Sequence, residues 1–530
     1  MKKILYYSML LLSLTGLNAC NDFLKEEPRN QISVSQFYAT PADATSSVNN
    51  LYRTGFPSFY NATSAYMGPV IMDGGYMSGL FDNQYKGQEK FVQDCQNLAI
   101  DPIVNNGSLL SVWQNCYVAI GRANNSIKYI PTTPGLATAD ANRLTAEAKF
   151  FRALNYFHLV KMFGGVPMIT EPYESIENLY IAKSPEADIY NMIVTDLNAA
   201  INEGGLADNP MPKNGFRISK GSVLALLADV YLNMSGLPVN GNKYAEAAAT
   251  AKLLINNSAY SLIPNGSTPE QSAYNVLRTS DNQNEYLYVI EYNTTISNGG
   301  WRPVYNFPNE AATWGEFTYN ITDNAYRPVT QILAAYDKIN DLRYQEKQYF
   351  HTKYTFTKGA RKGETVNFVD VTPYFWFEPD ALYTTNLSQK DQCHYRLAEM
   401  YLIAAEAIAQ TTGVNAEAAG YLATIQARAS LNKTQAQIVT ELLAMTKEAF
   451  IREVWKEKIR ELIFENKIWN DITRTRFYPT VSGGVFTFVP IIGAVNPWGK
   501  TFAEKNLLLP FPNDEIQRNP ELVQNPGYVK

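Results

Sequence analysis

Apolar residues recur at steps of three and four along much of the chain, which is the spacing of one face of an α-helix. The clearest case is the segment 144–163, where Phe151 and Leu154 lie on one stripe and Phe150 widens it. A stripe this wide predicts a helix that packs between neighbouring helices. Gly164 and the residues after it end the helix, because glycine is conformationally free and a proline follows closely.

Further segments show the same helical spacing and are bounded by capping or helix-breaking residues. The predicted helices are 184–201, 219–233, 244–256, 396–410 and 415–431, with a charged segment 441–474 that forms one long helix or two joined ones. Ser184 and Pro185 are expected to start the first of these. Helix, short turn and helix at a period of about 34 residues is typical of tetratricopeptide-like repeats. We therefore predict a mainly α fold, an interrupted α-solenoid built on tetratricopeptide-like helix pairs.

Two long segments, about 56–98 and 258–391, lack helical periodicity and are rich in Gly, Asn, Pro and aromatic residues. Within the second, 286–292 alternates as a short strand does. Irregular segments of this length are usually functional or disordered, and their aromatic content argues against disorder. We interpret them as loop insertions in a single domain that covers 34–530.

The first residues have the pattern of an export signal. Two lysines follow Met1, and 4–17 is a mostly apolar run of 14 residues, too short to span a bilayer comfortably. The run ends in Leu17-Asn18-Ala19-Cys20, which resembles a bacterial lipobox. We predict a signal peptide over 1–19, lipidation of Cys20 and a charged tether over 20–33; a plain secretory signal with an incidental Cys20 is the alternative.

Composition excludes several classes of function. With 45 basic and 50 acidic residues the net charge is −5, so no cationic excess favours nucleic-acid binding. Three His and four Cys leave little for zinc or His-based catalysis. Beyond Cys20, the three cysteines Cys95, Cys116 and Cys393 fit three buried thiols better than one Cys95–Cys116 bridge. Catalytic motifs such as GxSxG and HExxH are absent, so we expect neither an enzyme nor a cofactor.

Four separated stretches share the order and spacing of a known family. They are CNDFL at 20–24, AEAKFFRA at 146–153 continuing to FGGVP at 163–167, RLAEMYL at 396–402 followed by Glu461 and 465–471, and LPFP at 509–512 with NPGY at 525–528. In this arrangement the chain resembles the SusD/RagB family, the surface lipoproteins of Bacteroidetes nutrient-uptake systems. Asn466, Ile468 and Gln426 depart from the residues usual in that family, and all three fall on the predicted scaffold.

The resemblance implies a helical scaffold that carries ligand-binding loops and pairs with a SusC-type TonB-dependent outer-membrane barrel. It implies a non-catalytic protein, lipid-anchored on the outside of the cell outer membrane, that captures oligosaccharides and passes them to that barrel. Capture of peptides or another nutrient is the alternative, and a hydrolase or a scaffold without its own ligand also remains open. A structural calcium ion is possible in the family, although no EF-hand spacing is present.

Candidate ligand-binding residues follow from the chemistry of sugar recognition, which needs flat aromatic faces beside amide, carboxylate and guanidinium groups. One set in the second insertion comprises Trp301, Arg302, Tyr305, Asn306, Trp314 and Glu316, with Asn309 and Glu310 nearby. A second set in the first insertion comprises Asp73, Tyr76, Phe81, Asn83 and Tyr85, with Asp82 beside them. Glycan binding predicts solvent-exposed rings at Trp301 or Trp314; burial as loop-anchoring aromatics is the alternative. Tyr374, Trp376 and Phe377 are expected in a strand or in the core.

Overall fold

The structure is a computed structural model and describes residues 34–60, 75–83, 90–173, 179–293, 295, 299–319 and 326–529. The predicted signal peptide, Cys20 and the tether lie outside these residues. Within them, no helix is both long enough and apolar enough to cross a membrane.

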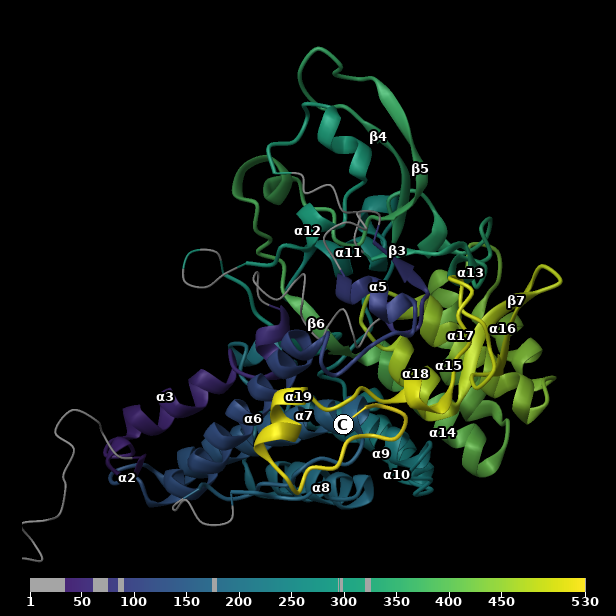
Figure 1. Cartoon of the computed structure of the whole chain (residues 1–530). Helices are drawn as coiled ribbons and strands as arrows, with labels where there is room; N and C mark the ends of the chain where they lie inside the picture. Colours follow the sequence, from purple (N-terminus) through teal and green to yellow (C-terminus); the bar gives the residue numbers. More distant parts are fainter. Residues whose placement is uncertain are drawn as a thin grey trace, which may run out of the picture.

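Long helices form the lower part of the molecule in Figure 1 and pack mainly against their neighbours in sequence. They are α3 (Pro41–Leu51), α6 (Asn106–Tyr129), α7 (Thr138–Phe163), α8 (Glu186–Glu203), α9 (Lys220–Ser235), α10 (Tyr244–Ile255), α14 (Leu397–Thr412), α15 (Ala416–Ala429), α16 (Gln435–Leu443) and α17 (Lys447–Glu461). Helix α10 packs on α14, so the solenoid continues across the whole second insertion. This arrangement confirms the predicted fold class.

Local sequence accounts for where most of these helices begin. Helix α9 starts with a capping box, in which the Ser219 side chain and the Ser222 backbone and side chain satisfy one another. Asn415 caps α15 by accepting a hydrogen bond from the Ala418 N–H. Helix α7 is buried around most of its circumference, as its wide apolar stripe predicts.

Two predicted helix boundaries are wrong. Ser184 does not cap α8; its N–H instead bonds to the Val166 carbonyl, and the helix begins at Glu186 after Pro185. The segment 441–474 takes the second predicted form, joined helices rather than one long helix, but its first full helix starts at Lys447 and not at 441. It contains the end of α16, all of α17 and most of α18 (Ile468–Thr475), and the break after α17 includes Asn466 at φ +60°. Asparagine tolerates this left-handed conformation, so it serves where the family usually has glycine.

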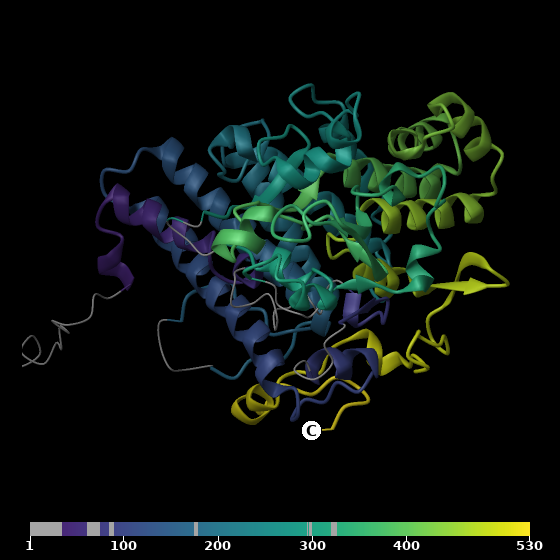
Figure 2. The ribbon, with the colours of Figure 1, turned by 90° about the horizontal axis from the view of Figure 1, so that it is seen from above.

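The insertions form the upper part of Figure 1 and contain short elements. Antiparallel strand pairs join β1 (Phe81–Asp82) to β3 (Arg327–Pro328), β2 (Tyr286–Ile290) to β6 (Gln392–Arg396) and β4 (Phe350–Thr355) to β5 (Thr365–Pro373); near the C-terminus β7 (Phe477–Ser482) pairs with β8 (Val485–Pro490). Short helices are α2 (Val34–Phe37), α5 (Lys90–Gln96), α11 (Ala273–Thr279), α12 (Arg302–Tyr305), α13 (Thr330–Leu333) and α19 (Asn513–Arg518). The β2–β6 pair brings the two ends of the second insertion together above the scaffold. Figure 2, the view from above, shows the β7–β8 hairpin projecting at one side.

A buried ionic network ties the second insertion to the scaffold. The Arg396 guanidinium, at the end of β6, donates to Glu285, Glu461 and Glu465 at 2.7–3.0 Å. Burial by itself raises the pKa of Glu461, but the guanidinium groups of Arg428, Arg396 and Arg343 outweigh it and hold the pKa at about 2. The network explains why the RLAEMYL stretch and the glutamates that follow it occur together.

The three cysteines beyond Cys20 are free. Cys95 and Cys116 are buried and Cys393 is half-buried, so the interpretation as three thiols is confirmed and the Cys95–Cys116 bridge is not formed. Burial raises the pKa of the Cys95 thiol, which keeps it protonated and unreactive.

Candidate functional site

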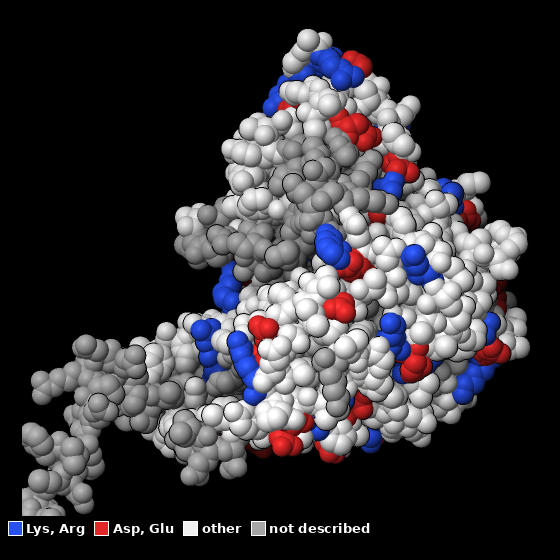
Figure 3. All heavy atoms as spheres, in the orientation of Figure 1, with Lys and Arg blue, Asp and Glu red and all other residues white. Residues whose placement is uncertain are grey.

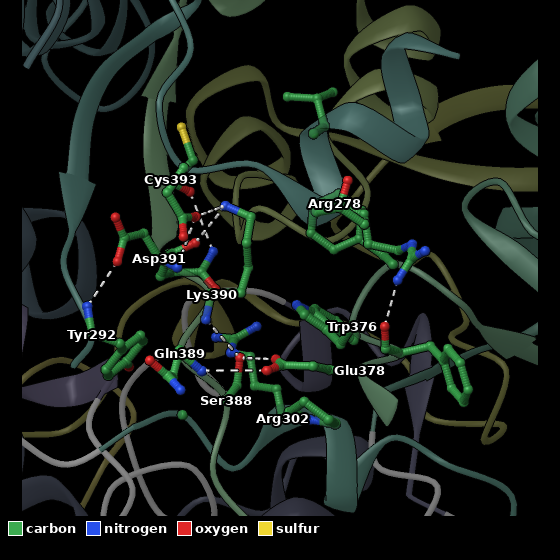
Figure 4. A pocket seen from close by; sticks show the side chains of 18 of the residues that line it. Arg278, Tyr292, Arg302, Trp376, Glu378, Ser388, Gln389, Lys390, Asp391 and Cys393 are labelled. Atoms are coloured by element: carbon green, nitrogen blue, oxygen red, sulfur yellow. Dashed lines mark hydrogen bonds and ion pairs between the residues drawn. The ribbon is translucent and has the colours of Figure 1, made fainter. Parts of the chain in front are cut away.

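A pocket of about 340 Å³ lies at the junction of the second insertion and the scaffold (Figure 4). Its walls come from α11, from the ends of β2 and β6, from the start of α12 and from the stretch 375–379. These elements are far apart in the sequence and meet because β2 pairs with β6. A pocket of this size is typical of a site for a small ligand.

One side of the pocket carries an ordered group of charges. The Lys390 ammonium donates to Asp281 Oδ1 at 2.5 Å, and the Asp391 N–H donates to the same oxygen at 3.1 Å. Asp391 Oδ1 accepts the N–H of Tyr292 at 2.8 Å. Burial and the neighbouring Asp281 raise the pKa of Asp391 to about 7, so this carboxyl group is half-protonated near neutral pH.

A second carboxyl group lies next to this group of charges. Glu378 accepts hydrogen bonds from the Ser388 hydroxyl and from the Gln389 N–H. Burial raises the pKa of Glu378, and the nearby Asp380 and Asp281 raise it further. Hydroxyl groups of a ligand can therefore meet both hydrogen-bond donors and acceptors in the pocket.

Aromatic side chains supply the apolar surface of the pocket. Trp376 is 8% exposed, and the Arg302 guanidinium lies 5.1 Å from the centroid of its ring. Tyr292 and Phe375 also line the pocket. Flat rings beside carboxyl and guanidinium groups are the combination that sugar recognition needs.

The structure separates the first predicted set. Arg302 lines the pocket, and Trp301, the residue before it, is half-buried and stacks on Tyr305 with ring centroids 5.6 Å apart. Asn306 is buried, and its amide nitrogen bonds to the Arg302 carbonyl. The segment around α12 thus brings one predicted side chain directly into the pocket.

Trp314 and Glu316 lie in a separate aromatic cluster with β4 and β5. The Trp314 indole stacks on Tyr354 with ring centroids 5.8 Å apart, and it is half-buried. Glu316 is 3% exposed and accepts hydrogen bonds from Tyr354, Thr357 and Tyr383. Burial raises the pKa of Glu316, but these donors outweigh it and lower the pKa. The Trp314 ring is therefore only partly exposed, and Glu316 ties its loop to β4 and to Tyr383.

The described members of the second set are buried. Tyr76 and Phe81 are fully buried and pack on Tyr326, and Asn83 is 3% exposed. Phe81 belongs to β1, whose pairing with β3 places the ring in the core. Their expected place on a ligand-facing surface is thus corrected to the interior. Asp73 and Tyr85 lie outside the described residues.

Sequence reasoning missed Arg278, Glu378 and Asp391 and assigned Trp376 to the core. Trp376 is indeed buried, but it also forms a wall of the pocket. No motif marks these residues, because their proximity depends on the pairing of β2 with β6. The polar run 388–391, just before β6, was the one local signal available.

Charge and metal-binding geometry add two observations. On the face shown in Figure 3, basic and acidic side chains are interspersed, and no basic patch dominates it. Within the described ranges, no group of three or more His, Cys, Asp or Glu side chains is arranged to hold a metal ion.

Comparison with known families gives the class of this fold. The sequence profile described as "SusD family" matches residues 256–528, and the profile described as "Starch-binding associating with outer membrane" matches residues 22–232. The first match covers more than half of the chain. The chain therefore belongs to the SusD family, a family of glycan-binding proteins.

Individual proteins agree with this assignment. The "SusD-like protein P2" of Formosa agariphila is 26% identical over 540 residues, which cover 98% of this chain and 99% of that protein. A SusD superfamily protein of Parabacteroides distasonis superposes with a TM-score of 0.79 at 28% identity and covers 92% of this chain and 99% of its own. The surface glycan-binding protein A of Bacteroides thetaiotaomicron, in complex with laminarihexaose, superposes with a TM-score of 0.67 at 17% identity, covers 92% of this chain and 99% of its own, and shows the shared fold.

Proposed function

We propose that this protein is a cell-surface glycan-binding lipoprotein that captures oligosaccharides and delivers them to a SusC-type TonB-dependent transporter, without chemistry of its own. The observation that supports this most is the pocket at the junction of insertion and scaffold, where Trp376 and Tyr292 lie beside hydrogen-bonding carboxyl and guanidinium groups. Family membership, and a neighbour of the same fold solved with laminarihexaose, support the same ligand class.

Lipidation of Cys20 and surface exposure belong to this proposal. A diacylglycerol and an N-acyl chain on Cys20 supply more than one lipid chain, which suffices for stable anchoring. The family description that mentions the outer membrane supports this location. Mass spectrometry of the full chain and of Cys20→Ser tests the anchor. We expect the lipid mass and membrane association in the full chain only; an unlipidated full chain contradicts the anchor.

Calorimetric titration tests ligand capture. The chain without residues 1–20, which lie outside the described fold, is titrated with plant, algal and host oligosaccharides and with oligopeptides. We expect modest affinity for saccharides, since an open site desolvates many hydroxyls for little buried area. Trp376→Phe keeps a ring and controls for folding, while Tyr292→Ala removes an aromatic face. Binding to peptides alone supports the alternative nutrient and contradicts glycan capture.

Two further measurements test delivery and the absence of catalysis. Purification of the tagged full chain from native outer membranes is expected to recover a TonB-dependent barrel in stoichiometric amount. Chromatography of bound oligosaccharides after long incubation is expected to show no cleavage. Turnover that is lost in Glu378→Gln or Asp391→Asn would instead indicate a hydrolase.

A further inference from the structure

Among the residues that the structure describes, the Arg302 guanidinium has no acidic partner. It lies against two aromatic rings, 5.1 Å from the centroid of Trp376 and 5.5 Å from that of Tyr60. Aromatic faces attract and orient a cation, but they leave its five N–H donors without acceptors. Arg302 lines the pocket, so a ligand can reach these donors.

A second guanidinium in the wall, that of Arg278, also has no carboxylate of the described part of the chain within ion-pair distance. Arg278 donates to the Phe377 carbonyl at 2.5 Å and to the Asn275 side chain at 3.3 Å, and it lies 4.4 Å from the Tyr374 ring centroid. Its hydrogen-bond acceptors are neutral, and no described carboxylate forms an ion pair with it.

Two of the four carboxyl groups that line the pocket already have a basic partner. Asp281 is paired with Lys390, and Glu465 with Arg396. Burial raises the pKa of both remaining carboxyl groups, Glu378 and Asp391, so each favours its neutral form more than an exposed carboxyl does. Arg302 and Arg278 are therefore the two lining guanidinium groups that form no ion pair with a carboxylate of the described residues.

The indole N–H of Trp376 is a further donor in this wall. It is buried in a side chain that is 8% exposed, and no group within the described ranges accepts its hydrogen bond. A buried donor without an acceptor is costly, and an acceptor supplied by a ligand relieves that cost. Figure 4 shows Trp376 and Arg302 in the same part of the pocket wall.

We propose that the pocket selects an anionic sugar unit, whose carboxylate or sulfate group is bound by the Arg302 guanidinium beside the Trp376 ring. This inference rests on the proposed glycan capture and names its substrate class. Guanidinium groups bind planar carboxylates and sulfate-like oxyanions through paired N–H donors, which neutral sugar hydroxyls cannot match. A uronate residue and a sulfate ester share this chemistry.

Matched ligands with and without charge test the proposal. The uronate arm uses oligogalacturonates, oligoglucuronates and alginate oligomers together with their methyl esters. The sulfate arm uses sulfated galactan and fucan oligosaccharides together with their desulfated forms. We expect at least one charged ligand to bind about tenfold or more tightly than its neutral partner, consistent with the strength of charge-assisted hydrogen bonds. The arm that binds identifies the source of the negative charge.

Variants assign the effect to Arg302. Arg302→Met is expected to remove the preference, so that the charged ligand and its neutral partner bind with affinities within about twofold of each other, while Arg302→Lys retains part of the preference. Arg361→Met, on the exposed turn between β4 and β5, is the matched control and should change neither affinity. Thermal melting confirms that each variant is folded.

Each outcome decides the question. Equal affinity for charged and neutral partners, binding of neutral glycans only, or an unchanged preference in folded Arg302→Met overturns the anionic assignment and leaves glycan capture intact. Binding to inorganic sulfate but to no saccharide, or to nothing in either arm or in the neutral panel, overturns both.

Discussion

Arg152 and Asp196 join α7 to α8 through two parallel hydrogen bonds, Nε to Oδ2 and Nη2 to Oδ1, each 2.7 Å long. The remaining guanidinium nitrogen, Nη1, donates to Asn124 in α6 and to the Thr170 carbonyl. One side chain thus fixes three consecutive helices and the segment that leaves α7. Arg152 belongs to the AEAKFFRA stretch, which explains in physical terms why that stretch marks the scaffold.

Asp196→Asn should destabilise the protein by about 3–5 kcal/mol, because it leaves the Arg152 charge buried without its counter-ion. Denaturant unfolding monitored by circular dichroism measures the loss. Glu441→Gln breaks the exposed pair with Lys433 and is the control, with an expected change of under about 1 kcal/mol. Equal effects of the two substitutions would show that the buried pair is not a structural tie.

Gly165→Ala should destabilise the end of α7. A Cβ atom at this position would lie 2.4 Å from the Ser184 carbonyl oxygen, and backbone atoms cannot move aside cheaply. We expect a loss of about 1–3 kcal/mol, as for other overpacked sites. Gly121→Ala, within α6, meets no atom within 4 Å and should instead add about 0.5–1 kcal/mol through helix propensity. Thermal melting of both variants should therefore show shifts of opposite sign.

Stability should depend on pH through Asp391. Its pKa is raised from 3.8 to about 7, so between these values the folded protein holds a proton that the unfolded chain has released. Stability contributed by this group is therefore lost as the pH rises through about 7. Asp391→Asn cannot ionise and should gain on the order of 1–3 kcal/mol relative to the native chain between pH 5 and pH 8.5. Urea titrations of both proteins at the two pH values measure the gain. If the difference in stability between the variant and the native chain is the same at both pH values, the raised pKa is contradicted.

Trp314→Ala should open the aromatic cluster around β4 and β5. The indole stacks on Tyr354 and Phe368, and its loss is expected to cost about 3 kcal/mol, the lower end for a Trp-to-Ala change, because the ring is half-buried. Amide hydrogen exchange should become faster in β4 and β5, with a smaller change in α7 and α9. Val369→Ala in β5, where the side chain is 82% exposed, is the control and should leave the exchange unchanged.

The scaffold was predictable because its signals are local. Ser219 and Asn415 sit at helix starts that their own side chains cap, and the wide stripe of α7 indicates burial on several sides. The predicted cap at Ser184 was wrong because the Ser184 N–H bonds to the Val166 carbonyl. This contact joins the segment before α8 to the segment after α7, and local sequence does not reveal it. The break after α17 was also hidden, since asparagine is common outside left-handed positions.

The site was predictable only in part, because aromatic composition does not say which ring is covered. Trp314 and Arg302 stand in the same irregular segment, but Trp314 is covered by Tyr354 and Phe368 from a hairpin far along the chain. Arg302 faces the pocket, whose other walls depend on β2 pairing with β6. These contacts are non-local, and no residue spacing encodes them.

The pocket has walls of two kinds. Arg396 and Glu465 belong to the ionic network that holds the scaffold together, whereas Arg302, Trp376 and Glu378 are carried by the insertion. A substitution in the first wall is expected to reduce the stability of the fold, while one in the second is expected to change mainly the proposed ligand specificity. Proteins that share this scaffold can therefore differ in ligand specificity through changes in the insertion wall alone. The scaffold wall stays the same and keeps the position of the pocket constant.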